Sequence, residues 1–512
     1  MIAVSIGRGR HRMMIAEHKH LAEQGAELVE LRLDYIQRAV NLKRLLNNRP
    51  CPVIITCRRE QDGGYWTRSE QDRIILLRTA IADGADYVDL EEDIAGKILR
   101  FGPTKRIVSY HNFDETPQNL REIHDRCSAH DPDIVKIATK ANSPHDNLRI
   151  LSLISESEVP TVAMCMGDIG IPSRILAGKF GAPFAYATFH KERAVAPGQL
   201  SFQEMREVYH YDQIDLDTDV YGVIADPVGH SLSPVIHNAA FQALGMNKVY
   251  VPFRVRAEDL EDFLSYNRQL SVKGLSVTIP HKEAVLPYLE RTDAAVDHIG
   301  AANTIVYDGF DKSGHNTDHE AAVDSIVKGL RRGEELDLFT GRNALVLGAG
   351  GVARAVVYAL QSRGVTVVIA SRTLKRAEQL AKEFRSRAVP WHARHSISCD
   401  ILVNCTPVGM HPNVNNCPIQ EDYLSRSMIV FDMVYNPEQT LLIKQAREKE
   451  CLVVTGVDMF IRQAAYQFEL FTGQEAPEDV IRQALMNEIS AVRTVLGRKE
   501  QAVTPSTEDD SS

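Results

Sequence analysis

Eight short runs of β-branched and apolar residues in the first 210 residues constrain the fold of this chain more than any other feature. They recur at intervals of roughly 20 to 30 residues, which is the spacing of βα units in a parallel sheet. Stretches with helical periodicity, such as QDRIILLRTAIADGA, lie between them. Eight such units predict a (β/α)8 barrel, whose functional site lies at the carboxyl ends of the strands. The runs begin at residues 2, 28, 52, 87, 106, 134, 161 and 184.

Polar side chains lie within or just beyond the later part of several runs. In a barrel such positions converge on one mouth, so we expect these side chains to share a site. For any one of the arginines a surface ion pair is the simpler explanation, but the joint pattern favours a binding pocket. The residues are Glu30, Arg32, Arg58, His111, Lys136, Arg174 and Gln199.

The run IVKIAT at 134–139 places a lysine among apolar neighbours. In a strand, Ile134, Lys136 and Ala138 point to one face, which is expected to be the barrel interior. A buried ammonium is costly unless it is paired, neutralised or used chemically. A desolvated lysine can lose its proton and attack a ketone to form a Schiff base. The alternative is that Lys136 pairs with Glu30 and only stabilises the barrel.

A Schiff base acidifies the adjacent C–H bond, so the same chemistry needs a base nearby. His111, one strand earlier, is the candidate because its ordinary pKa lies near neutrality. We expect Glu30 to orient the imidazole, and Arg58 and Arg174 to hold a substrate carboxylate. The first half is therefore predicted to catalyse elimination or aldol-type chemistry through an imine.

The composition excludes several classes of protein. A formal net charge of −10 leaves no basic excess for a nucleic-acid partner. No apolar run reaches the length of a membrane span, so no membrane partner is expected. The eight cysteines form no CxxC pair and no cluster with histidine at zinc spacing, so no metal is expected. With no signal peptide ahead of them, they are interpreted as reduced thiols of a cytoplasmic protein.

A different pattern begins after an acidic, irregular stretch at 207–219, which we interpret as a linker. The segments around 225–241, 273–285 and 300–323 are rich in Ser, Thr, Asn, Asp and Gly, which supply hydrogen bonds rather than core. They predict a binding surface for a polar ligand. Lys282 and Asp318 are a cation and a carboxylate on two of these segments, and either could belong to a proton-transfer pair.

The segment NALVLGAGGVARAVVYALQSRGVTVVIASRT at 343–373 predicts a strand, a glycine turn, a helix and a second strand. Gly348, Gly350 and Ala353 form a GxGxxA pattern directly after the first strand. Such glycines let the chain turn and approach a pyrophosphate at the helix N-terminus. We expect a Rossmann domain with a dinucleotide site.

The residues after the second strand select the cofactor. NAD enzymes usually carry Asp or Glu there, whereas this chain has Ser371, Arg372 and Thr373, followed by Arg376. Two arginines suit the 2′-phosphate of NADP. The alternative is that both are solvent-exposed arginines at the start of a helix.

The motifs of the first half resemble those of type I 3-dehydroquinate dehydratase, a (β/α)8 barrel enzyme. The motifs are ELRLD at 30–34, TCR at 56–58, SYHNF at 109–113, VKIAT at 135–139, SRILAGKFG at 173–181 and APGQLS at 196–201. The resemblance implies that Lys136 forms a Schiff base with 3-dehydroquinate and that His111 is the general base and acid in loss of water. The other five polar residues of the predicted mouth would then line the substrate site.

The second half resembles shikimate dehydrogenase, a two-lobed enzyme with a Rossmann domain. The motifs include ADPVGHSLSPVIHNAAF at 225–241, VTIPHK at 277–282, GAANT at 300–304, NTD at 316–318, GAGGVARA at 348–355 and NCTPVGM at 404–410. The order of the two halves is that of the fused bifunctional enzyme of the shikimate pathway. The resemblance implies that the second half reduces 3-dehydroshikimate to shikimate with NADPH.

The resemblance also implies roles for individual residues of the second half. Lys282 and Asp318 would be the catalytic pair. The substrate would contact Ser231, Ser233, Thr278, Asn303, Tyr435 and Gln463. The cofactor NADP(H) would contact Gly348, Ala349, Gly350, Gly351, Ser371, Arg372, Thr373 and Arg376.

Three positions depart from the family patterns. Asp62 stands where a glutamate often supports the catalytic histidine, Val195 replaces a hydroxyl residue, and Ser276 replaces an asparagine. We expect these changes to affect affinity more than the type of reaction.

The expected architecture is α/β, with a barrel followed by a two-lobed dehydrogenase unit. The expected domains are the barrel at 1–210, a substrate-binding domain at 219–318 completed by helices at 457–498, an NADP-binding Rossmann domain at 319–456 and a disordered tail at 499–512. Two alternatives stay open: a quinate/shikimate dehydrogenase of broader specificity in the second half, and a regulatory binding protein that has lost catalysis.

Overall fold

The computed structural model of the chain describes residues 1–190, 198–229, 231–330 and 339–489. The chain divides into two compact units. The first is formed by Met1–Pro234 and Gly245–Val272, and the second by Val235–Leu244 and Lys273–Ser512. Among the described residues, no helix combines the length and the apolar character that crossing a bilayer requires.

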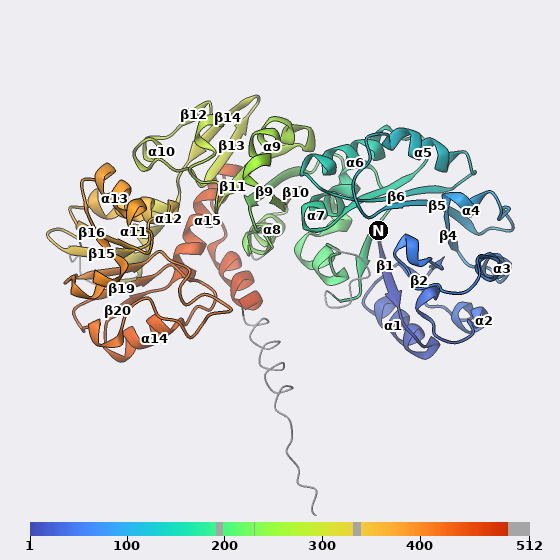
Figure 1. The fold of residues 1–512 in the computed structure, drawn as a ribbon, viewed down its shortest axis with the longest axis horizontal. Helices are drawn as coiled ribbons and strands as arrows, with labels where there is room; N and C mark the ends of the chain where they lie inside the picture. The colour runs from blue at the N-terminus through green and yellow to red at the C-terminus, as the bar shows by residue number, and fades with distance from the viewer. Residues whose placement is uncertain (191–197, 230, 331–338, 490–512) are drawn as a thin grey trace, which may run out of the picture. The chain divides into compact units, whose positions relative to one another are not determined.

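Eight parallel strands form the centre of the first unit (Figure 1). They pair in the order β7-β6-β5-β4-β3-β2-β1-β8, so the sheet curls into a barrel that is closed except between β7 and β8 within the described residues. Every predicted run becomes one of these strands. The strands are β1 (Ile2–Gly7), β2 (Leu28–Arg32), β3 (Val53–Thr56), β4 (Tyr87–Glu91), β5 (Lys105–Asn112), β6 (Ile134–Lys140), β7 (Thr161–Met166) and β8 (Ala185–Thr188).

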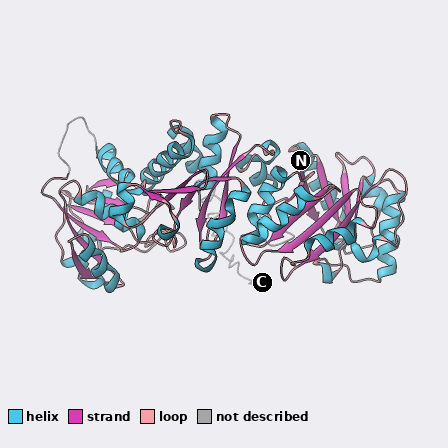
Figure 2. Ribbon diagram, turned by 90° about the horizontal axis from the view of Figure 1, so that it is seen from above, coloured by secondary structure: helices cyan, strands magenta, loops and turns pink. Residues whose placement is uncertain are grey.

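Helices follow the strands and lie outside them, as the (β/α)8 arrangement requires (Figure 2). The third helix shows the local reasons for its position. The Ser69 side chain accepts a hydrogen bond from Asp72 N and caps its first turn, while Leu77 and Ile81 are buried. The helices are α1 (His11–Glu23), α2 (Leu42–Leu46), α3 (Glu70–Ala82), α4 (Glu92–Ala95), α5 (Leu120–Ser128), α6 (His145–Glu156) and α7 (Ile171–Leu176).

The interior of the barrel confirms the predicted face of Lys136. Ile134 and Ala138, its neighbours at two residues' distance, belong to one apolar cluster with Ile107 and Val162 from the adjacent strands. Side chains alternate across a strand, so Lys136 points to the same side. Its charged end therefore lies among the residues that fill the barrel.

The rest of the first unit contains a parallel pair of strands, β9 (Asp219–Ala225) and β10 (Lys248–Arg254), and helix α9 (Leu260–Tyr266). Gly222 lies opposite Val251 in this pair. A Cβ added at Gly222 would lie 2.4 Å from the Val251 carbonyl oxygen and 2.5 Å from the Phe253 ring. Only a residue without a side chain fits here.

The second unit begins with a small mixed sheet. Strand β13 pairs antiparallel with both β11 and β14, and β12 pairs in parallel with β14. Its elements are β11 (Val272–Val277), β12 (Arg291–Thr292), β13 (Thr304–Asp308), β14 (Asp311–His315), α8 (Ser233–Ala243), α10 (Ala294–Ile299) and α11 (Asp318–Leu330).

A six-stranded parallel sheet follows, in the order β17-β16-β15-β18-β19-β20. This order, with the first strand at the centre, is that of a dinucleotide-binding Rossmann domain. Side chains along each strand point alternately into two apolar cores, one on each face of the sheet. Val346 faces the core that contains α12, and Leu347 faces the core that contains α14. The elements are β15 (Asn343–Leu347), β16 (Thr366–Ser371), β17 (Arg387–Pro390), β18 (Ile401–Asn404), β19 (Ile429–Asp432), β20 (Leu452–Val454), α12 (Gly351–Gln361), α13 (Leu374–Glu383) and α14 (Leu441–Glu448).

The chain continues into α15 (Gly456–Thr472) and a further helical segment at 478–489. Of the predicted C-terminal helices at 457–498, the last nine positions lie outside the described residues, as does the predicted tail at 499–512.

We expect Gly222→Ala to lower the free energy of unfolding by about 2 kcal/mol, because the new methyl group collides with backbone of the neighbouring strand. Urea unfolding followed by circular dichroism measures the change. Gly229→Ala is the matched control, since no atom lies within 4 Å of a Cβ at that position. Equal unfolding transitions for the two variants would contradict this account of the packing.

Candidate active sites

The carboxyl ends of the barrel strands surround a pocket that opens to solvent. The structure brings all seven polar residues predicted for this mouth into the wall of the pocket. Ser5, Asp62, Phe113 and Tyr186 also contribute to it. The seven predicted residues are Glu30, Arg32, Arg58, His111, Lys136, Arg174 and Gln199.

Lys136 lies between two carboxylates. Its Nζ is 2.9 Å from Asp89 Oδ2 and 3.5 Å from Glu30 Oε1, and it lies 4.0 Å from the centre of the Tyr186 ring. The pairing with Glu30, which was the structural alternative for this lysine, is therefore present. The same amine also borders the pocket, so a structural and a chemical role are compatible.

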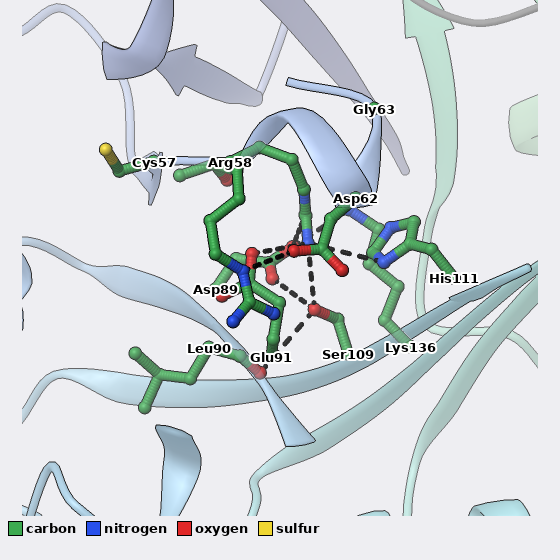
Figure 3. Close-up of polar contacts among 12 residues, drawn as sticks. Cys57, Arg58, Asp62, Gly63, Asp89, Leu90, Glu91, Ser109, His111 and Lys136 are labelled. Carbon is green, nitrogen blue, oxygen red and sulfur yellow. Dashed lines mark hydrogen bonds and ion pairs between the residues drawn. The ribbon is translucent and has the colours of Figure 1, made fainter. Parts of the chain in front are cut away.

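Asp89, on β4, is a site residue that the sequence reasoning missed (Figure 3). Its carboxylate accepts hydrogen bonds from Arg58 Nη2 at 2.8 Å and from Ser109 Oγ at 2.6 Å, besides the contact with Lys136. Burial alone would raise its pKa, but the charges of Arg58 and Lys136 hold that pKa far below its ordinary value. The signal was available: an acid inside the apolar run YVDLEE is as unusual as the lysine of IVKIAT.

His111, on β5, contacts Arg58 rather than an acid. Its Nδ1 lies 3.3 Å from Arg58 Nη1, and because a guanidinium only donates, Nδ1 must be the acceptor. Desolvation lowers the pKa of His111 well below its ordinary value near 6.5, and the charges of Arg58 and Lys136 lower it further. The imidazole is therefore neutral, and its lone pair lies on Nδ1, which faces Arg58.

Glu30 is held by side chains from the two neighbouring strands, β1 and β3. Its two carboxylate oxygens accept hydrogen bonds from Ser5 Oγ at 2.6 Å and Thr56 Oγ1 at 2.8 Å. Burial would raise its pKa, but the charges of Lys136 and Arg32 lower it. The described contacts join Glu30 to Lys136 and none joins it to His111, so its expected role in orienting the imidazole has no geometric support.

The arginines of the mouth differ in their partners. Arg58 donates to Asp89 and, at 3.1 Å, to Glu91, while Arg32 donates to both carboxylate oxygens of Asp34 at 2.8 and 3.0 Å. Arg174 is buried and has no carboxylate partner among the described residues. Its Nε is unsatisfied, and Nη1 reaches only a methionine sulfur.

Burial lowers the pKa of Arg174 to about 10. A buried guanidinium without an acid partner is a ready site for an anion. Of the two arginines that we expected to hold a carboxylate, Arg174 is the one that remains available.

Two further predicted positions can be placed. Asp62 accepts a hydrogen bond from Arg59 Nε at 2.5 Å, and the described contacts do not link it to His111. Gln199 is buried and lines the pocket. Val195 lies outside the described residues.

In the second unit, Lys282 and Asp318 form a buried pair. Lys282 Nζ lies 2.5 Å from Asp318 Oδ2, and Asn303 Nδ2 donates to the other carboxylate oxygen at 2.9 Å. Asp318 begins α11, and its N–H donates to Asn316 Oδ1. The predicted pair is thus one ion pair, with Asn303 as its support.

The pair lies beside the glycine turn of the Rossmann sheet. A Cβ added at Gly351 would be 3.1 Å from Lys282 Cδ, so the lysine side chain passes close to the first turn of α12. Gly348 has φ +116°, and a Cβ there would lie 3.0 Å from the Cys405 carbonyl oxygen. These glycines allow a close approach of backbone at the point between β15 and β18 where the strand order reverses.

Helix α15 contains Gln463, and its Phe460 packs against Tyr435. Tyr435 is stacked on Phe460 with ring centroids 4.4 Å apart, and burial raises its pKa. Gln463 Nε2 donates to Phe460 O, and Gln463 O accepts from Thr317 Oγ1 at 3.2 Å. This bond ties the helix to the residue that precedes Asp318.

The remaining predicted substrate residues, and Ser276, lie at or near the ends of β11 and α8. Thr278 directly follows β11 and is half-buried. Ser276 donates to Gln467 Oε1 at 2.7 Å, so its hydroxyl serves a buried contact within the second unit. Ser231 and Ser233 belong to the first unit, where Ser233 N donates to Ser231 Oγ.

The predicted cofactor residues surround the ends of β15 and β16. Gly348, Ala349 and Gly350 form the turn between β15 and α12. Ser371 ends β16, and its Oγ accepts from Thr373 N at 3.2 Å. Arg372 and Arg376 are exposed, and no carboxylate of the described residues pairs with them. The described residues contain no group of three His, Cys, Asp or Glu side chains placed to hold a metal.

Family models match almost the whole chain. Residues 2–216 match type I 3-dehydroquinase, and residues 223–305 match the substrate binding domain of shikimate dehydrogenase. Residues 333–435 match shikimate/quinate 5-dehydrogenase, and residues 456–486 match the shikimate 5′-dehydrogenase C-terminal domain.

Individual relatives cover one or both halves. The chloroplastic bifunctional 3-dehydroquinate dehydratase/shikimate dehydrogenase of Arabidopsis thaliana is 36% identical over 498 residues, which are 92% of this chain and 82% of that protein. The NADP(+) shikimate dehydrogenase of Caldanaerobacter subterraneus is 40% identical over 54% of this chain and 100% of its own length. A crystal structure of shikimate dehydrogenase in complex with NADP+ gives a TM-score of 0.51 at 35% identity, over 54% of this chain and 97% of the other. The chain therefore belongs to the bifunctional 3-dehydroquinate dehydratase/shikimate dehydrogenase family and has both of its enzyme activities.

Proposed function

We propose that the barrel dehydrates 3-dehydroquinate through a Schiff base on Lys136, and that the second half reduces the resulting 3-dehydroshikimate to shikimate with NADPH. The observation that carries the first part is the pocket itself. It is lined by an amine, a neutral imidazole and a buried guanidinium that has no acid partner among the described residues. These are the groups that an imine-forming elimination on a carboxylated ketone requires.

The dehydration proceeds through three groups. Arg174 binds the substrate carboxylate, and Lys136 attacks the ketone carbon as an amine. Of the three protons of its ammonium, two leave with the ketone oxygen as water and one stays on the iminium nitrogen. His111 then removes a proton from the carbon next to the iminium. The resulting imidazolium protonates the β-hydroxyl group, which leaves as water, and hydrolysis of the imine frees the amine.

The two carboxylates beside Lys136 fit this chemistry. Asp89 and Glu30 lie within 3.5 Å of Nζ, where the positive charge of the iminium develops. Fixed negative charges at that position stabilise the intermediate relative to the free ketone. Gln199, Arg32 and Arg58 complete the proposed substrate wall.

The reduction uses the Lys282–Asp318 pair. NADPH supplies the hydride, and Lys282 gives a proton to the oxygen on which negative charge develops. Asp318 holds the ammonium in place at 2.5 Å, and Asn303 holds Asp318. Ser231, Ser233, Thr278, Tyr435 and Gln463 are the proposed substrate contacts.

The residues around β15 and β16 fit an NADP cofactor. Nothing lies within 4 Å of a Cβ at Gly350, so the backbone at the start of α12 is open to a pyrophosphate. Arg372 and Arg376 supply positive charge for a 2′-phosphate, with Ser371 and Thr373 beside them. We assign Gly348, Ala349 and Gly351 to the same site.

The domain bounds predicted from the sequence complete the proposal: the barrel at 1–210, the substrate-binding domain at 219–318 with the C-terminal helices, and the Rossmann domain at 319–456. A reducing compartment such as the cytoplasm is supported by the eight cysteines, all of which are free. The partners are the three small-molecule substrates and NADP(H).

The decisive experiment supplies 3-dehydroquinate and NADPH together and looks for shikimate. Within it, Lys136→Ala should abolish dehydration and the covalent adduct that borohydride traps with 3-dehydroquinate. The same variant should still reduce supplied 3-dehydroshikimate at a rate close to that of the wild type, because Lys136 is absent from the second site. Lys140→Ala, an exposed lysine of the same strand, is the control. Absence of an adduct on the wild-type chain would refute the imine mechanism.

The cofactor assignment predicts the behaviour of the double variant Arg372→Ala/Arg376→Ala. Loss of two charges from the 2′-phosphate site should raise the KM for NADPH by about tenfold and leave the KM for NADH nearly unchanged. Steady-state kinetics with both cofactors measures the difference. Lys382→Ala removes an exposed charge from the last turn of α13, the helix that contains Arg376, and should change neither KM. Equal effects on both cofactors would argue against NADP selection by these arginines.

If His111 acts as a base, its imidazole should be neutral in the free enzyme, which can be tested by titration. Its pKa is lowered in the folded chain, so the imidazole should stay neutral at pH 6, where an unperturbed histidine is mostly protonated. Nitrogen chemical shifts measured by NMR over pH 5 to 8, assigned with a His111→Asn variant, test this expectation. A midpoint at or above 6.5 would contradict it.

A further inference from the structure

Asp432, at the end of β19, is a buried carboxylate that the proposed mechanism does not use. Its side chain has an exposed fraction of 0%. No lysine, arginine or histidine of the described residues forms an ion pair with it, which is unusual for a buried acid. Its environment therefore needs an explanation.

Three donors surround the carboxylate. Oδ1 accepts hydrogen bonds from Asn404 Nδ2 at 2.9 Å and from Val434 N at 3.1 Å, and Oδ2 accepts from Thr440 Oγ1 at 2.6 Å. Asp432 thus joins its own loop after β19 to two other segments of the Rossmann domain, the end of β18 and the cap of α14.

The neighbours of these donors fix their orientation. Asn404 Oδ1 accepts from Thr406 N and Thr406 Oγ1, which leaves only its Nδ2 to face Asp432. Thr440 Oγ1 accepts from Ile443 N as the cap of α14, so its own proton points to the carboxylate. The site is therefore built for an acceptor without a proton of its own.

One of the tethered segments borders the glycine turn. Asn404 Nδ2 also donates to Val408 O at 3.2 Å, which closes the loop after β18. Within this loop, the Cys405 carbonyl lies 3.0 Å from the position of a Cβ on Gly348, and Cys405 N donates to Leu347 O. Any movement of Asn404 therefore changes the wall of the proposed cofactor site.

The other segment carries Tyr435. Met433 N donates to Asn404 O at 3.0 Å, and Val434 N donates to Asp432. Val434 O lies 2.5 Å from where a Cβ on Gly456 would be, so this segment packs closely on the start of α15. The ring of Tyr435 follows directly and stacks on the same helix.

We propose that Asp432 is a positioning residue for the reduction. Its carboxylate fixes two loops: the loop after β18, which lies against the glycine turn, and the loop after β19, which presents Tyr435. The inference deepens the proposed function and rests on the dehydrogenase site described above. Asp432 touches neither substrate nor cofactor and acts through Asn404, Val434 and Thr440.

The proposal has a pH signature. Burial raises the pKa of Asp432 to about 6, although its three donors oppose the rise. The other titratable groups that face it are Cys405 and Cys417, whose thiols have pKa values raised by burial and stay neutral at this pH. As the pH falls through about 6, Asp432 gains a proton. That proton finds no acceptor, because the three neighbours of the carboxyl group all donate hydrogen bonds to it. NADPH binding and kcat/KM for the reduction should therefore weaken below this pH.

The test compares Asp432→Asn with Thr440→Val. Asp432→Asn should raise the KM for NADPH by about tenfold, with a smaller change in kcat, and should remove the inflection near pH 6. Thr440→Val keeps the acid but removes one donor, so the inflection should move to higher pH. Asp400→Asn is the matched control, since that acid accepts from Asn343 N at the opposite end of the same sheet. Dehydration by the same chain reports that the barrel is intact.

An Asp432→Asn variant with the wild-type KM and the wild-type inflection would overturn the inference. If that variant fails to fold, an unshifted inflection in Thr440→Val overturns it instead. The pH dependence of NADPH binding, measured by titration calorimetry, separates this inference from the proposed function. Failure of the wild-type chain to reduce 3-dehydroshikimate would defeat the function, while the binding profiles would still decide the role of Asp432.

Discussion

Parallel pairing of strands is the constraint on which both sites depend. In a parallel sheet every strand runs in the same direction, so the loops that follow the strands meet at one edge. In the barrel this edge collects Glu30, His111 and Lys136 from three strands into one pocket. In the Rossmann sheet it brings the glycine turn after β15 beside Cys405 after β18. The chemistry in each case occupies a position that the topology had already created.

Buried charge is the second theme of the molecule. At the barrel mouth Asp89 pairs with both Arg58 and Lys136, so three ionisable side chains share one buried cluster. The energetic cost of such burial is offset only when every charge is paired or hydrogen-bonded. Among the described residues, Arg174 has no carboxylate partner, whereas Asp432 has no cationic partner but accepts three hydrogen bonds.

Much of this could be predicted from particular residues. The eight β-branched runs became the eight barrel strands, and the alternation around Lys136 correctly placed its side chain inside. Glu30 was placed in the right pocket, but besides Lys136 its partners are Ser5 and Thr56 from the two flanking strands. Asp89 was missed because its importance arises from neighbours on β5 and from β6 beyond it, which lie far away in the sequence.

The local sequence pattern was therefore sufficient to predict the strands, the glycine turn, the inward direction of Lys136 and the residue types available for catalysis. These features depend on side-chain periodicity and backbone geometry, which nearby residues determine. The tertiary structure alone decided which charges meet. The register between strands, and not their spacing in the chain, put Asp89 beside Lys136 and tied Asn404 to Asp432. Which charged groups interact depends on the distance between them in space, and that distance is set only when the whole chain has folded.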